Sequence, residues 1–130
     1  MSEKKFKIPV PEINEETQHF WDATAEGKLL VKKCADCNEF HYYPRTICPF
    51  CMSGNTEWIQ STGKGTVYTY SVMRRSPVQY CIAYVTLDEG ITMMTNLVDI
   101  DLDEIKIGMD VQVAFVDTGE GCALPYFTGA

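Results

Sequence analysis

The chain has 130 residues, the size of one ordinary domain or of two small modules in series. Hydrophobic residues make up 45% of it, which is too many for a disordered protein. Eighteen acidic and 11 basic residues give a net charge of -7, and this sign disfavours polyanionic partners such as nucleic acids. No run of 18 uncharged apolar residues occurs, so we expect no membrane span.

The chain starts with basic residues, as a signal peptide does, but no apolar run follows them. Pro9, Pro11 and Glu12 stand where that run would be. We therefore expect a cytoplasmic protein. In that compartment, six cysteines indicate metal or redox chemistry more than disulfide bonds. Residues 1–13 are charged and contain proline, so we expect an extended arm there.

A short helix is predicted from Asn14 to about Ala25. Asn14 can cap its first turn and Gly27 can end it. The apolar content of this segment is chiefly Phe20 and Trp21, so the helix must dock on another element to be stable.

Two C-x2-C pairs separated by ten residues follow the helix. Two thiolates on one tight turn can bind one side of a metal ion, and a second pair completes a tetrahedral shell at about 2.3 Å per Zn–S bond. The residue after each pair must tolerate unusual backbone angles, which Asn38 does more easily than Met52. The predicted ligands are Cys34, Cys37, Cys48 and Cys51.

A structural zinc ion is the expected occupant, since a module of about 30 residues cannot bury enough core to fold without a metal. Iron in a rubredoxin-like site is the first alternative, and disulfides or free thiols are the second. Four protein sulfurs leave no open position for water or substrate. His41 lies between the pairs but is not needed as a ligand. Short β segments around 29–31 and 40–42 should flank the pairs, and Trp58 and Ile59 lead out of the module.

Five strands are predicted after Gly63, with a polar connection at 99–108 that has room for one helical turn. This order suits a small Greek-key barrel of the OB type, and a curled five-stranded sheet of another topology is the alternative. We expect Gly63, Lys64 and Gly65 to act as the hinge between the modules. The predicted strands are residues 66–72, 80–87, 91–98, 111–115 and 124–127.

No active site is predicted in the chain. The two histidines, His19 and His41, are not placed near a nucleophile by sequence. Cys81 lies among apolar neighbours, where cysteine acts as a small hydrophobe, and Cys122 lies in a looser context without a recognisable catalytic signature.

Nucleic-acid binding is the alternative function, because ribbons and OB barrels often serve nucleic acids. From Gly65 onward the chain has three basic and nine acidic residues, a net charge of -6, whereas such sites need a cationic groove. Tyr68, Tyr70 and Tyr84 could form a stacking platform, but we expect them to pack a core instead.

Taken in order, the motifs resemble one known family: OB-fold proteins with a rubredoxin-like zinc ribbon, long classed as a domain of unknown function and linked to acyl-CoA metabolism. Asn38 stands where that family often has glycine, and Tyr43 where it often has a second proline. The motifs are Phe20-Trp21, Gly27-x-Leu29, the two cysteine pairs, Tyr43-Pro44-Arg45, Gly63-x-Gly65, residues 80–87 with Glu89-Gly90, Ile107-Gly108 with residues 111–115, and Leu124-Pro125-Tyr126-Phe127.

The resemblance implies a mainly β protein with three segments: residues 1–27 as an arm and helix, 28–62 as the zinc ribbon, and 63–130 as a five-stranded OB-fold domain. It also implies a non-catalytic accessory subunit that forms hetero-oligomers with a thiolase-fold enzyme, or with a related aldolase or hydratase. The small subunit would help to form or shield the acyl-CoA site, while the partner supplies the catalytic groups. An electron carrier with iron is the third reading.

Coenzyme A carries several phosphate charges, so a face that binds it needs cations beside an apolar groove. In so acidic a chain the candidates are few, and we expect Arg45, Lys64 and Arg74 to be CoA contacts. The chain also has more apolar residues than two small cores should bury, which predicts a partner interface. The residues taken for that surplus are Phe20, Trp21, Phe50, Tyr126 and Phe127.

Overall fold

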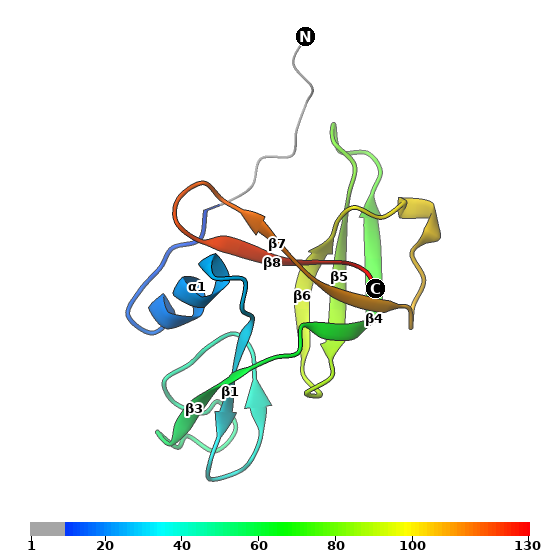
Figure 1. The fold of residues 1–130 in the computed structure, drawn as a ribbon. Coiled ribbons are helices and arrows are strands. Elements are labelled where there is room, and N and C mark those ends of the chain that lie inside the picture. The colour runs from blue at the N-terminus through cyan, green and yellow to red at the C-terminus, as the bar shows by residue number, and fades with distance from the viewer. Residues whose placement is uncertain (1–9) are drawn as a thin grey trace.

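The structure, a computed structural model, describes residues 10–130 and has one short helix, a small sheet and a five-stranded barrel (Figure 1). Most of the predicted N-terminal arm lies outside the described residues. The helix is α1 (Gln18–Ala25), and the small sheet has β1 (Leu30–Cys34), β2 (Phe40–His41) and β3 (Thr56–Gln60). The barrel has β4 (Lys64–Met73), β5 (Tyr80–Leu87), β6 (Thr92–Leu97), β7 (Asp110–Asp117) and β8 (Ala123–Gly129).

Helix α1 begins four residues later than predicted. Asn14 caps a separate turn, in which its Oδ1 accepts a hydrogen bond from the Thr17 amide at 3.1 Å. The helix proper starts after Thr17. Its end is as predicted, because Gly27 has a φ of 78° and its amide bonds to the carbonyl of Thr24 at 3.0 Å.

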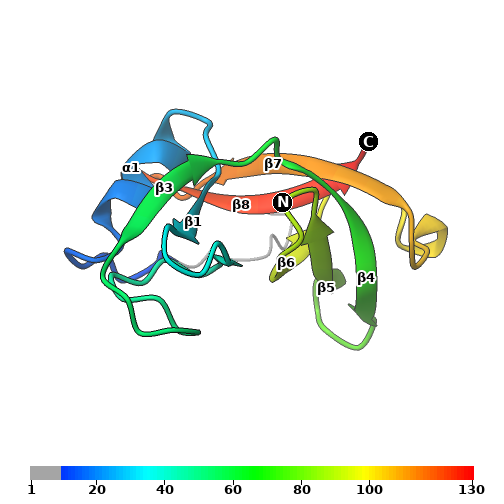
Figure 2. The same cartoon turned by 90° about the horizontal axis from the view of Figure 1, so that it is seen from below.

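The helix lies between the small sheet and the barrel and contacts both (Figures 1 and 2). Phe20 is fully buried, and its ring meets the ring of Tyr43 edge-on at 5.6 Å. The indole nitrogen of Trp21 donates a hydrogen bond to the Tyr43 hydroxyl at 2.9 Å. On the barrel side, the Ala123 amide donates to the buried Thr24 hydroxyl at 3.1 Å. The helix was expected to need a docking surface for Phe20 and Trp21. The small sheet with its loops and the barrel together provide that surface.

The small sheet has the order β2-β1-β3, with both pairs antiparallel. β3 was not predicted as a strand, because its sequence Thr56–Gln60 alternates too weakly in polarity to be distinguished from a connection. Lys32 on β1 faces Trp58 on β3, with its Nζ 4.3 Å from the indole ring and 3.2 Å from the Thr56 hydroxyl.

The second sheet closes on itself in the order β4-β5-β6-β8-β7, which confirms the OB-like barrel. Four neighbouring pairs are antiparallel, and β6 meets β8 in parallel at Leu97 and Phe127. The connection between β6 and β7 contains the predicted single helical turn, Leu102–Glu104. The strand order and the closure exclude the alternative, a curled five-stranded sheet of another topology.

The predicted hinge at 63–65 is wrong, because these residues are built into the barrel. Lys64 and Gly65 belong to β4, and a Cβ atom on Gly65 would lie 2.5 Å from the carbonyl oxygen of Thr86. The Gly63 carbonyl accepts a hydrogen bond from the Val113 amide at 2.7 Å. Just before it, the Ser61 hydroxyl donates to the Glu89 carboxylate at 2.7 Å. A segment so closely bonded cannot act as a free hinge.

The buried apolar side chains form one continuous cluster, not two separate cores. Phe20 of the helix, Val31 of the small sheet and Phe127 of the barrel are all members. The predicted division of the chain into three segments, at 27/28 and at 62/63, therefore stays a prediction. No helix within residues 10–130 is both long and apolar enough to pass through a bilayer.

Candidate functional site

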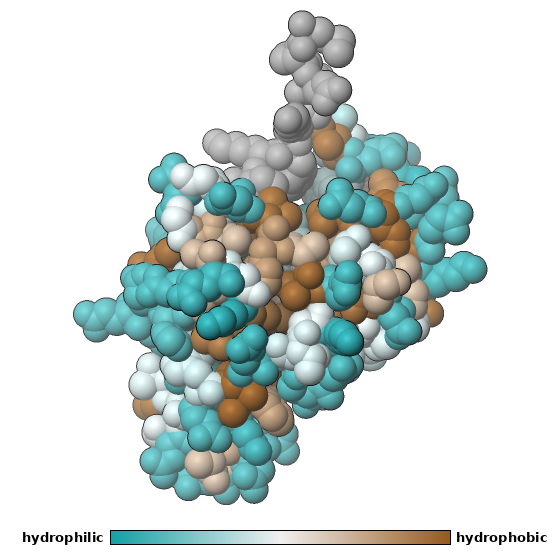
Figure 3. All heavy atoms as spheres, viewed as in Figure 1, coloured by the Kyte–Doolittle hydropathy of each residue, from teal (hydrophilic) through white to brown (hydrophobic). Residues whose placement is uncertain are grey.

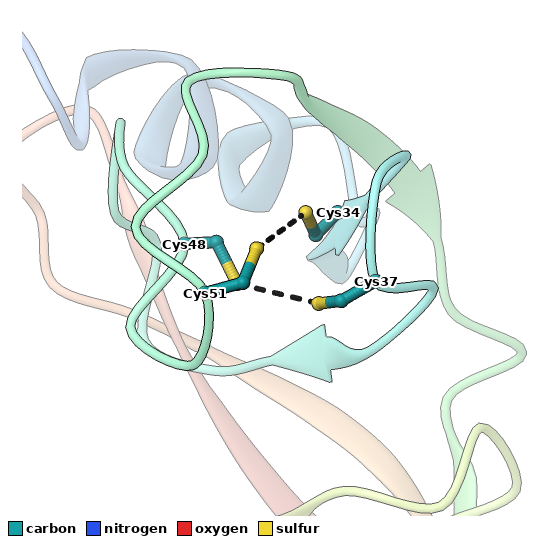
Figure 4. Close-up of side chains that lie close together, drawn as sticks. All are labelled: Cys34, Cys37, Cys48 and Cys51. Carbon is teal, nitrogen blue, oxygen red and sulfur yellow. Dashed lines mark hydrogen bonds between the residues drawn. The ribbon is translucent and has the colours of Figure 1, made fainter.

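The four cysteines of the two pairs converge at one end of the small sheet (Figure 4). The Sγ atoms of Cys34 and Cys51 are 3.5 Å apart, those of Cys37 and Cys48 are 3.7 Å apart, and all four lie within 4.8 Å of one another. Four sulfurs at about 2.3 Å from one central ion would be about 3.8 Å apart in a regular tetrahedron. The four cysteines are thus positioned to bind a single tetrahedral metal ion.

The two cysteine turns share one backbone conformation. In each turn the amide of the residue after the second cysteine donates to the carbonyl of the first, from Asn38 to Cys34 and from Met52 to Cys48, both at 2.9 Å. These two residues have φ values of 61° and 67°. The expectation for Asn38 is confirmed. Met52 adopts the same left-handed conformation although its side chain favours it less.

Backbone amides of Cys37 and Asp36 lower the pKa of Cys34 to about 7, which favours the thiolate form that binds metal. The neighbouring thiols and burial instead raise the pKa of Cys37 and Cys51. The Phe50 amide donates to the sulfur of Cys48 at 3.4 Å. The Asp36 carboxylate also accepts a hydrogen bond from the side-chain amide of Asn55 at 3.2 Å, which joins the first turn to the segment after the second.

His41 is buried but does not belong to the sulfur cluster. Its Nε2 accepts a hydrogen bond from the Arg45 amide at 3.3 Å, and among the described residues its Nδ1 has no partner. Burial lowers the pKa of His41, and the nearby charge of Lys32 lowers it further. The imidazole is therefore a neutral group that holds the loop between the two cysteine turns.

The predicted CoA contacts do not form one cluster. Arg45 pairs with Glu16 at 3.5 Å, and Arg74 pairs with Asp103 at 2.9 Å, with both pairs at the surface. Lys64 is exposed at the first residue of β4, while Arg74 directly follows the last. A ten-residue strand separates its ends by about 30 Å. Their role in binding CoA stays a prediction.

The remaining cysteines and histidines are kept apart. The buried Cys81 thiol lies 3.6 Å from the Ile82 carbonyl, and burial raises its pKa. Cys122 lies 3.5 Å from the Thr118 hydroxyl, and His19 stacks edge-on against an indole ring. Within residues 10–130, no hydrogen bond joins a cysteine to a histidine.

The prediction that the barrel tyrosines pack a core is wrong for two of the three. Tyr68 is 65% exposed and Tyr84 is 44% exposed, whereas Tyr70 is half-buried. The pairing of β4 with β5 shifts register between Val67 and Thr69, so Tyr68 is an extra residue that the regular alternation did not include.

The predicted apolar surplus is also corrected. Phe20, Trp21 and Phe127 are buried in the core, and Tyr126 is half-buried. Phe50 alone of the five is exposed, at 64%. The reason is the continuous core, which accommodates more large side chains than two separate small cores would.

Comparison with known proteins places the chain in a family. The family model described as the rubredoxin-like zinc ribbon domain of ChsH2 matches residues 21–57, and that of the C-terminal OB-fold domain of ChsH2 matches residues 58–116. A "DUF35 domain-containing scaffold protein" of Pyrococcus furiosus is 32% identical over 104 residues, covering 75% of this chain and 76% of its own. The chain belongs to the DUF35 family. The resemblance noted in its motifs is thereby confirmed.

Two other relatives of this DUF35 protein carry the name of an enzyme or an enzyme subunit, and a third shares the fold alone. The solved structure "Ltp2-ChsH2(DUF35) aldolase" is 32% identical, with a TM-score of 0.82 over 92% of this chain and 98% of that one. A "Probable enoyl-CoA hydratase alpha subunit" of Thermomonospora curvata is 33% identical over 127 residues, and the chain spans 40% of its length. A DUF35 structure from Sulfolobus solfataricus, at 12% identity and a TM-score of 0.64, shares the fold.

Proposed function

We propose that this DUF35 protein is a non-catalytic accessory subunit of a complex that processes acyl-CoA, with a thiolase-fold enzyme as its partner. The observation that carries the proposal is the four-sulfur cluster, whose members would fill every position of a tetrahedral shell around one ion. A metal held there has no open position for a substrate. The four-cysteine site of the described chain is therefore suited to a structural metal and not to a catalytic one.

The metal in this site is proposed to be zinc. Thiolates from four cysteines suit both zinc and iron, but zinc is the ion of most ribbons with closed four-sulfur shells. Bound zinc would join the two cysteine turns across β1 and β2, and it would add the folding energy that so small a sheet lacks. The iron-bearing electron carrier is the alternative, and the colour of ferric tetrathiolate distinguishes it from colourless zinc.

The proposed partner class rests on the names of the relatives. One is a subunit of a hydratase acting on enoyl-CoA and another belongs to an aldolase with a second component. A thiolase-fold enzyme is our first candidate, from the motif resemblance, and an aldolase or a hydratase is the alternative. The partner would supply the nucleophile and the base, since no described cysteine of this chain is hydrogen-bonded to a histidine.

The complex, and not this chain alone, is proposed to bind a CoA thioester. Arg45 and Arg74 already pair with carboxylates, so either would have to exchange its partner for a phosphate. Lys64 is exposed and forms no salt bridge with the described residues. We place the complex in the cytoplasm, without a membrane or nucleic-acid partner.

The test is purification of the tagged chain from its source organism, followed by co-expression with the CoA-thioester enzyme that co-purifies. We expect the two chains to elute together in size-exclusion chromatography. Neither should cleave or form the thioester well alone, and together they should. A monodisperse monomer that neither co-elutes with a thiolase-fold enzyme, an aldolase or a hydratase nor changes its rate would defeat the proposal.

A further inference from the structure

Three neighbouring strands of the barrel carry no charged side chain apart from Lys64, the first residue of β4. This holds for all the other residues of β4, β5 and β6, although charged residues make up 22% of the chain. A solvent-facing surface of this size normally carries charges, which maintain solubility. The lack of charge therefore indicates a surface that is covered in the working protein.

The outward side chains of these strands form a continuous surface. Tyr84 on β5 is the register partner of both Thr69 on β4 and Met94 on β6. Tyr68, at the register shift, is 65% exposed, Tyr84 is 44% exposed and Met94 is 62% exposed. We call this surface the neutral face, and it comprises Tyr68, Thr69, Ile82, Tyr84, Met94 and Asn96.

We propose that the neutral face is the site at which the partner enzyme docks. This inference rests on the proposed function and adds the surface through which the complex forms. Tyrosine and methionine are enriched at protein interfaces and charged residues are depleted at their centres, which is the composition found here. A tyrosine side chain buries a large area at a small cost in ordering, and the flexible thioether of methionine can adapt to an irregular partner surface.

Charge argues against a nucleic acid as the occupant. Tyrosines on an OB barrel can stack bases, but single strands also require cations along their phosphates. The neutral face has none. Around the face lie Lys64 at the start of β4 and, in the connecting loops, Arg74, Arg75 and Lys106, against six loop carboxylates: Asp88, Glu89, Asp99, Asp101, Asp103 and Glu104. A fitting partner surface is therefore apolar at its centre and basic at its border.

Area argues against a second copy of the chain. Three strands about 4.8 Å apart and about seven residues long cover roughly 300 Å². Two copies joined through this face would bury about 600 Å² in total, half of the roughly 1,200 Å² of the smallest stable interfaces. Two chains of net charge -7 would also repel each other. A larger partner that extends past the face avoids both difficulties.

A hollow beside the face offers a place for an anchoring side chain. It has a volume of about 270 Å³, and its walls include Tyr80, Asn96, Leu97 and Tyr126. Asn96 belongs to the neutral face, so the two are continuous. The volume is below the roughly 300–1,000 Å³ of pockets for small molecules, and it suits one apolar side chain of a partner.

The experiment compares three aspartate variants in the complex with the co-purifying CoA-thioester enzyme. Met94→Asp and Tyr84→Asp place a charge on the face, and each should raise the Kd at least about tenfold. Gln112→Asp is the matched control, since Gln112 is also exposed on a barrel strand but lies on β7. It should leave the Kd unchanged. Thermal melts must show that all three variants fold.

A second measurement avoids substitution by a charge. Benzoylphenylalanine in place of Tyr84 should crosslink on illumination to the same enzyme, and at Gln112 it should not. If the wild-type complex forms but both face variants bind normally, or crosslinks arise only at Gln112, the neutral face is not the docking site and the proposed function survives. If chains with benzoylphenylalanine at Tyr84 crosslink only to each other, the second copy replaces the enzyme. If no complex forms at all, the proposed function itself fails.

Discussion

Asn38 and Met52 occupy equivalent places in the two cysteine turns, but only one of them suits its backbone. The left-handed conformation costs an ordinary residue about 1–2 kcal/mol, and Met52 adopts it with a φ of 67°. Its side chain is 74% exposed, so packing does not offset this cost. The conformation must be held by the turn itself, which positions two sulfurs toward a common centre.

Loss of one sulfur should therefore abolish metal binding and folding together. We predict that Cys34→Ser reduces the bound metal from one ion per chain to none and removes most of the soluble protein, because metal binding is folding energy in such modules. Metal analysis of the purified protein measures the first effect and the soluble yield the second. Cys122→Ala is the control and should keep its ion, since that thiol lies outside the cluster. Well-folded wild-type protein without zinc or iron would contradict the prediction.

His41 should make stability depend on pH below neutrality. Its pKa is lowered by burial and by Lys32, so the unfolded chain takes up a proton near the ordinary value of 6.5, whereas the folded chain takes it up only at lower pH. The free energy of unfolding should then fall as the pH drops below about 6.5 and be independent of this residue above it. The backbone hydrogen bond with Arg45 and the charge of Glu16 raise the pKa of His41, whereas the charge of Arg45 lowers it.

Urea unfolding between pH 5 and pH 7.5 measures this dependence. Acid also weakens thiolate binding of metal, in the wild type and in variants alike. His41→Gln therefore serves as the comparison, because it removes the titrating group and should give a shallower decline. Equal slopes for the two proteins would show that His41 does not contribute.

At the scale of the elements, Gly65 shows how closely β4 and β5 approach. A Cβ atom there would lie 2.5 Å from the Thr86 carbonyl oxygen and 2.8 Å from a methyl group of Val85. We predict that Gly65→Ala lowers the free energy of unfolding by about 1–3 kcal/mol, because a backbone atom cannot move aside. Gly54→Ala is the matched control, with no heavy atom within 4 Å of the added carbon. Denaturant unfolding of both variants measures this difference. Equal free energies of unfolding for the two variants would contradict the prediction.

The barrel could be predicted from the sequence because its strands alternate regularly and are rich in β-branched and aromatic residues. The metal ligands could be predicted because their spacing has a direct geometric meaning. Strand β3 could not be predicted, since the polar and apolar side chains of Thr56–Gln60 follow no clear period and none of them is buried. The exposure of Tyr84 could not either. Alternation tells that two faces exist, but not which of them is the interior when both carry apolar side chains.

The whole molecule has an uneven surface. The side seen in Figure 3 carries hydrophobic residues across its middle, whereas hydrophilic residues mainly cover the far end of the small sheet. The net charge of -7 is therefore not spread evenly, since one barrel face carries none of it. Long-range electrostatics should repel polyanions even though two exposed tyrosines could stack on bases.

We predict no appreciable binding of a labelled single-stranded DNA or RNA oligonucleotide at physiological salt. The part of the chain from Gly65 onward has a net charge of -6, and binding would bring like charges together. Fluorescence anisotropy titration is the measurement, with a known single-strand-binding protein as the positive control. A micromolar Kd that weakens steeply with salt would support the nucleic-acid alternative instead.

The short segment between Gln60 and Lys64 gives the molecule a fixed internal geometry. Its backbone and side chains bond to Leu29, Glu89 and Val113, which lie on either side of it. The metal-bearing end and the barrel should therefore turn together as one rigid body. Anything bound at one end would be presented to a second molecule at a constant distance and angle, so the chain can act as a molecular spacer that sets how two proteins face each other.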